Sequence, residues 1–78
     1  MKHVKLDFFS EVIVNDNVKN NIKKSEYHNL KGVVLGIREE DDGGFGYGIL
    51  LYKYNLCFDF ESDELTATGK KFKREDFY

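Results

Sequence analysis

The stretch that decides the fold spans residues 30–52 and reads LKGVVLGIREEDDGGFGYGILLY. Two apolar runs flank a short acidic turn that ends in two glycines. Because glycine supplies the positive φ angles of tight reversals, this pattern predicts a hairpin with strands over residues 31–38 and 45–52. Three more glycines lie inside these strands, where glycine occurs mainly at sharp bends or under a crossing backbone. They are Gly36, Gly46 and Gly48. The stretch therefore predicts a small, strongly curved β-barrel.

The N-terminal third of the chain predicts one strand and one long loop. Alternation over residues 6–14 predicts a strand. Its shared face would carry Leu6, Phe8, Val12 and Val14. Residues 15–29 contain five asparagines and no periodicity, which is typical of a long surface loop. The side chains expected to hold this loop against the body are Val18, Ile22 and Tyr27.

The C-terminal part predicts two further strands with one helical turn between them. The strands are expected over residues 56–60 and 66–68, and the turn begins at Ser62, which would cap it. Residues 6–69 would form the body of a single domain, and residues 70–78 a charged, aromatic tail. Five strands, a long first loop and a helical turn before the last strand predict an all-β, SH3-like barrel.

Apolar residues of the predicted strands are expected to form a single core. Its members would be Val12, Val14, Val34, Leu35, Ile37, Ile49, Leu51, Phe58 and Leu65. Cys57 lies between Leu56 and Phe58 with no basic neighbour to lower its pKa, so we interpret it as a small buried hydrophobe.

Length, charge and cysteine content narrow the class of protein. The chain has 78 residues and a formal net charge of −2, which argues against nucleic acid as the main partner. A single cysteine excludes an internal disulfide and fits a reducing compartment. No apolar run has the length of a signal peptide or a membrane span. We therefore expect a cytoplasmic protein.

Candidate catalytic residues are few, and we expect neither an enzyme nor a cofactor. His3 and His28 lack further histidine or cysteine ligands at the spacing of a metal site. Residues 43–48 are rich in glycine, but phosphate loops join a strand to a helix, whereas an acidic run and a strand flank this segment. Barrel geometry explains these glycines better than phosphate binding does.

Two acidic groups and one aromatic tail are the candidate binding residues. The first acidic group occupies the hairpin tip and the second surrounds the predicted fourth strand, and together they could steer a basic partner. Their members are Glu39, Glu40, Asp41, Asp42, Asp59, Glu61, Asp63 and Glu64. The secondary candidates are Phe72, Phe77 and Tyr78, which follow a run of lysines that could also hold single-stranded nucleic acid.

Several of these motifs together resemble the immunity protein 31 family of bacterial polymorphic toxin systems. The matching residues begin with Leu30, Gly32, Val34, Leu35, Gly36, Ile37, Glu40, Asp41, Tyr47 and Gly48. The resemblance resumes at Asp63, Glu64, Leu65, Thr68, Gly69, Lys73, Arg74, Glu75, Asp76, Phe77 and Tyr78.

The resemblance implies a small, non-catalytic protein that binds and neutralises a cognate toxin by covering its active surface. Many such toxins are nucleases with basic surroundings, and the acidic residues suit a partner of that charge. A standard interface takes about 800 Å² of surface from each partner. A folded protein of this mass is expected to expose roughly 4,900 Å², so such an interface would cover about one sixth of its surface. The alternative is an SH3-like module that binds a peptide or a nucleic acid.

Overall fold

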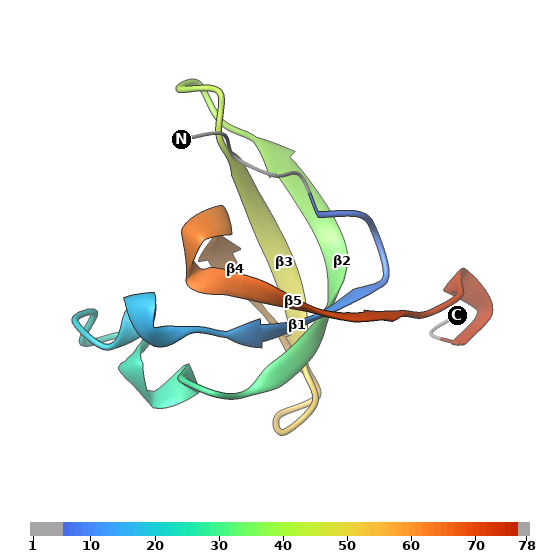
Figure 1. Ribbon diagram of the computed structural model, residues 1–78, viewed down its shortest axis with the longest axis horizontal. Helices are drawn as coiled ribbons and strands as arrows, with labels where there is room; N and C mark the ends of the chain where they lie inside the picture. The colour runs from blue at the N-terminus through green and yellow to red at the C-terminus, as the bar shows by residue number, and fades with distance from the viewer. Residues whose placement is uncertain (1–5, 77–78) are drawn as a thin grey trace.

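The computed structural model describes residues 6–76 and shows one antiparallel sheet of five strands (Figure 1). The strands are β1 (Ser10–Val14), β2 (Lys31–Glu39), β3 (Phe45–Leu51), β4 (Leu56–Glu61) and β5 (Leu65–Lys71). Their order across the sheet is β4-β3-β2-β1-β5. The described helices are short 3-10 turns: η1 (Asp16–Val18), η2 (Ser25–Tyr27), η3 (Ser62–Glu64) and η4 (Arg74–Asp76). The all-β prediction is confirmed. The sheet has two free edges, so a closed barrel is not confirmed.

The predicted hairpin is present as β2 and β3, the long, bent strands at the centre of Figure 1. The amide of Glu40 donates to the carbonyl of Gly44 at 2.9 Å, and Gly43 has a φ of 85°. The Asp42 carboxylate accepts the Gly44 amide at 2.9 Å, a side-chain bond that shapes the turn. Acidic residues and glycines therefore both build this reversal.

The glycines in the strands differ in how much space each leaves for a side chain. Gly36 and Gly48 face each other beside a register shift in β2, which bends the strand. A Cβ at Gly36 would lie 3.8 Å from the nearest atom of Gly48, an ordinary contact, so of the two predicted reasons for glycine the bend applies there and the crossing backbone does not. The close approach occurs at Gly32, where a Cβ would lie 2.5 Å from the carbonyl oxygen of Leu50.

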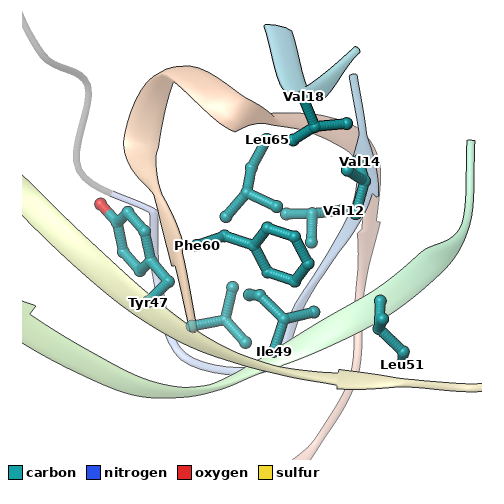
Figure 2. Close-up of a cluster of buried hydrophobic side chains, with 9 residues drawn as sticks. Val12, Val14, Val18, Tyr47, Ile49, Leu51, Phe60 and Leu65 are labelled. Carbon is teal, nitrogen blue, oxygen red and sulfur yellow. The ribbon is translucent and has the colours of Figure 1, made fainter. Parts of the chain in front are cut away.

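The core lies on one face of the curved sheet, and the ring of Phe60 is at its centre (Figure 2). Six predicted members are confirmed: Val12, Val14, Val34, Ile49, Leu51 and Leu65. Three members were not predicted: Val18, Tyr47 and Phe60. Ile37 and Phe58 are only partly buried against the cluster. The prediction for Leu35 is wrong: it is half-buried outside the cluster, at the register shift between Val34 and Gly36, where regular alternation along the strand is interrupted.

The first strand is shorter than predicted. It begins at Ser10, because Phe9 has a φ of 66° and interrupts the extended backbone. Phe8 is 49% exposed, so its placement on the core face is wrong. Leu6 still packs against the core, and its amide donates to the Tyr47 hydroxyl at 2.9 Å.

The long loop over residues 15–29 contains η1 and η2 and packs onto the body. Val18 is fully buried and Tyr27 is partly buried against the core, as predicted, whereas Ile22 is 95% exposed and its prediction is wrong. Lys24 contacts the carboxylate of Glu64 at 2.8 Å. The loop is therefore held to η3, which begins directly after β4.

The turn before the last strand is present as η3, but the expected cap is wrong. Glu61 is the N-cap, and its amide donates to the Glu64 carboxylate at 2.8 Å. The last strand also continues past Gly69, which has a φ of 93°, and ends at Lys71. The first two residues of the predicted tail therefore belong to the sheet.

Cys57 is exposed, so its interpretation as a buried residue is wrong. Alternation along β4 places it opposite the face of Phe58 and Phe60. That opposite face belongs to an edge strand and is open to solvent.

Candidate functional site

The two acidic groups predicted from the sequence meet at one end of the sheet. The hairpin tip and the β4–η3 junction enclose a shallow hollow of about 390 Å³. Its lining is mostly acidic and consists of Glu40, Asp42, Gly44, Phe45, Glu61, Ser62 and Asp63. The strand register causes this meeting, because Gly46, next to the tip, pairs with Glu61.

Arg38 lies among these acids and reaches across the sheet to them. The register sets Arg38 on β2, Gly46 on β3 and Glu61 on β4 in one row. A Cβ at Gly46 would collide with the Arg38 guanidinium group. Gly46 therefore lets the arginine lie flat over β3 and approach carboxylates two strands away.

The Arg38 guanidinium forms a loose network with three carboxylates. Its nitrogens lie 3.5 Å from Asp59, 3.6 Å from Glu61 and 3.8 Å from Glu40. The arginine side chain is 45% exposed, so solvent weakens each of these pairs. Arg38 alone is ion-paired with these three carboxylates, so one guanidinium does not balance their charge.

Glu40 and Glu61 form a carboxyl pair at the edge of the hollow. Protonated Glu61 can donate a hydrogen bond to the Glu40 carboxylate, which raises the pKa of Glu61 above its ordinary value of 4.5, and partial burial and the Glu40 charge raise it further. Arg38 and Lys24 oppose this rise. A carboxyl pair that shares a proton lowers the local negative charge as the pH falls.

The remaining acidic candidates are divided between the surface and the interior. Glu39 and Asp41 are exposed at the hairpin tip beside the hollow, and Asp59 is exposed and faces Arg38. Glu64 differs from the others: it is 8% exposed, and Lys24 and the Glu61 amide bind its carboxylate. Glu64 is therefore committed to the fold and does not line the hollow.

The secondary aromatic candidates are only partly described. Phe72 is half-buried, its amide donates to the carbonyl of Phe9, and the Lys70 ammonium lies 4.8 Å from the centre of its ring. Phe77 and Tyr78 lie outside the described residues. The structure therefore does not place these three side chains together.

Residues 6–76 contain no group of three or more histidine, cysteine or acidic side chains arranged to hold a metal ion. His28 contacts the carboxylate of Asp16, and His3 lies outside the described residues. None of the helices in the described part of the chain is long and apolar enough to cross a membrane.

The sequence alone did not predict Arg38, Phe45 or Ser62 as residues of this site, although it placed Ser62 in the helical turn. Arg38 had a detectable signal: once the hairpin turn is placed, it pairs with Gly46, and a glycine opposite an arginine leaves room for the long side chain. Phe45 and Ser62 have no comparable signal, because the approach of η3 to the tip brings them together.

Comparisons with known proteins add no relative. No family model, no curated protein and no solved structure matches this chain.

Proposed function

We propose that this protein is an immunity protein, which binds a cognate toxin and neutralises it by occlusion, without catalysis. The acidic hollow carries the proposal, because carboxylates from the tip and from the β4–η3 junction border one space. Negative charge gathered on one surface speeds the encounter with a basic partner and fixes its orientation. A nuclease toxin, whose active site holds phosphates with basic side chains, is the kind of partner that this charge suits.

The size of the protein supports occlusion as the mechanism. The chain exposes 5457 Å² of surface, so a standard interface of about 800 Å² would cover about 15% of it. The hairpin tip, the hollow and the exposed part of β4 together would form such an interface. One partner would then occupy this whole end of the molecule.

The alternative proposal is an SH3-like module that binds a peptide or a nucleic acid. The exposed lysines of β5 and its continuation would favour nucleic acid, and they are Lys70, Lys71 and Lys73. Arg74 adds one more positive charge, and Glu75 and Asp76, which follow it, reduce the positive charge of this segment. The neighbouring gene separates the two proposals: a secreted protein with a C-terminal toxin domain supports the immunity protein.

The test is co-expression of the toxin domain encoded beside this protein. The wild type should restore growth. A double variant, Asp42→Asn with Asp63→Asn, should associate with the purified toxin roughly 10-fold more slowly at low salt, because it has lost charges that steer the encounter. Its association rate should also depend less on salt. Asparagine keeps an oxygen that can accept the Gly44 amide, so the hairpin turn should persist.

The matched control carries the same change of charge away from the hollow. Glu26→Gln with Glu75→Gln removes two exposed carboxylates and should associate like the wild type. Wild-type protein that gives no protection would contradict the immunity proposal. Equal association rates for both double variants would show that the toxin docks elsewhere.

A further inference from the structure

Strand β4 is an open edge of the sheet. It pairs with β3 only, in an uninterrupted register from Leu51 opposite Leu56 to Gly46 opposite Glu61. An edge strand presents a row of backbone donors and acceptors that another strand can pair with. Within residues 6–76, the backbone hydrogen bonds outside the sheet include none with residues 57–60.

The direction of the free backbone groups follows from Glu61. Its amide donates to the Glu64 carboxylate instead of to β3, so this residue turns its backbone groups to the outer edge. Residues with outward groups alternate along an antiparallel strand. The backbone groups of Asp59 and Cys57 therefore also face outward, two positions and four positions before Glu61.

The two faces beside this edge differ in chemistry. On the core side, Leu56 is 60% exposed. Near it the rings of Tyr54 and Phe58 lie 5.9 Å apart, and Tyr27 lies 4.8 Å from Phe58. On the opposite side are the acids Asp59 and Glu61, which share the single Arg38 guanidinium at 3.5 and 3.6 Å, so that two carboxylates there face one arginine. A strand added here would meet apolar side chains on one face and carboxylates on the other.

We propose that the outer edge of β4 binds an extended segment of the partner protein in which basic and apolar side chains alternate. The segment would add a sixth strand, with backbone hydrogen bonds to Cys57 and Asp59 and with its basic side chains beside the acids. The identity of the partner as a toxin rests on the proposed function, whereas the binding mode rests on the edge itself.

A second copy of this chain fits the edge less well. Two β4 strands paired antiparallel would place Asp59 and Glu61 of both copies on the same face, where like charges repel. Strand β5 carries the complementary lysines, but Gly69, with its φ of 93°, interrupts its extended backbone. A basic, regularly extended strand from another protein therefore matches β4 better, because its charge is complementary and its backbone is uninterrupted.

The test uses a short peptide of alternating lysine and valine, blocked at both ends, titrated into isotope-labelled protein. We expect amide shifts centred on residues 57–61. Cys57→Pro should weaken binding about 10-fold or more, because proline removes an outward donor without removing a bond to β3. Cys57→Ser keeps this donor and should bind like the wild type.

A modified peptide makes the test independent of any variant's folding. The same peptide with N-methyl groups on alternate amides keeps its charge but cannot pair on its methylated edge. It should bind the wild type at least about 10-fold more weakly. Unchanged binding of the methylated peptide would overturn the proposal, as would equal binding to Cys57→Pro or shifts centred on β5. Self-association of the protein through β4 would also overturn it.

The toxin separates this proposal from the proposed function. Both proposals are supported if the Cys57→Ser variant neutralises the toxin and a folded Cys57→Pro variant does not. Neutralisation by both variants would overturn strand addition and leave the immunity proposal standing. If the peptide binds at β4 but the wild-type protein gives no protection against the toxin, strand addition stands and the immunity proposal is overturned.

Discussion

The two edge strands of the sheet, β4 and β5, differ in how readily another strand could pair with them. Strand β5 is exposed from Thr66 to Lys71, but Gly69 breaks its extended backbone and Lys70 and Lys71 add charge. Strand β4 has an unbroken register and combines the exposed Leu56 with acids. Lysines and local irregularities are known devices that protect an edge from pairing. The difference indicates that β5 is the blocked edge and β4 the available one.

The two edges also differ in how they are attached to the body. Strand β4 is anchored by Phe60, which is 1% exposed in the centre of the core. Strand β5 buries only Leu65 and relies on a polar contact further along: the Thr68 hydroxyl donates to the Glu11 carboxylate at 2.8 Å. The Tyr52 hydroxyl donates to the same carboxylate at 2.9 Å. Apolar packing therefore holds one edge, and hydrogen bonds contribute to holding the other.

The largest expected effect tests the apolar anchor of β4. Phe60→Ala should lower the free energy of unfolding by about 3–5 kcal/mol, because it leaves a cavity in a small core. Lys71→Ala, on the exposed part of β5, should change it by less than about 0.5 kcal/mol. Urea unfolding of both variants measures this difference. Similar values for the two would mean that the edges are not anchored in different ways.

The next effect tests the polar attachment of β5. The Thr68 hydroxyl bond lowers the pKa of Glu11 from 4.5, and the Tyr52 hydroxyl and nearby lysines act in the same direction, against the effect of burial. A lowered carboxyl pKa contributes stability above the unfolded-state value, and this stability is lost as the pH falls through the folded-state value.

Glu11→Gln should therefore cost about 1–2 kcal/mol at pH 7 and less at a pH below the pKa of Glu11. Unfolding by urea across this pH range measures the change, and Glu75→Gln, exposed beyond β5, is the control with the same chemical change. A cost that stays constant with pH would show that the charge of Glu11 does not attach β5.

The smallest effect on stability tests the acidic end of β4. In Gly46→Ala the new Cβ would displace the Arg38 guanidinium. Because Arg38 lowers the pKa of Glu61, this pKa should rise above its already raised value. The free energy of unfolding should change by less than about 1 kcal/mol, since the displaced group is a flexible, half-exposed side chain.

The titration of the Glu61 carboxyl carbon by NMR measures this shift. Gly48→Ala is the matched control, because its Cβ would meet only ordinary contacts at 3.8 Å. It should leave the pKa of Glu61 as in the wild type. Equal pKa values in both variants would show that Arg38 does not need the space at Gly46.

Local patterns predicted most of the sheet but less of the site. The hairpin, the last two strands and six core residues follow from turn chemistry and alternation, which act over a few neighbouring residues. The exposure of Cys57 and the burial of Phe60 depend on which face of β4 meets the body. The sequence predicted the acids of the hollow as two groups, and it did not predict their meeting or the position of Arg38.

The sequence by itself determined an all-β chain with a glycine turn, two acidic groups and a polar long loop. These features depend on local backbone preferences and on the order of residues along the chain. Only the tertiary structure decided that β4 is an open edge and that Glu40 and Glu61 lie together. It also decided that Glu64 is buried, with its carboxylate against Lys24, so that this residue is not exposed to a partner. The physical reason is strand register, which is fixed by the packing of the whole core and places residues distant in sequence side by side.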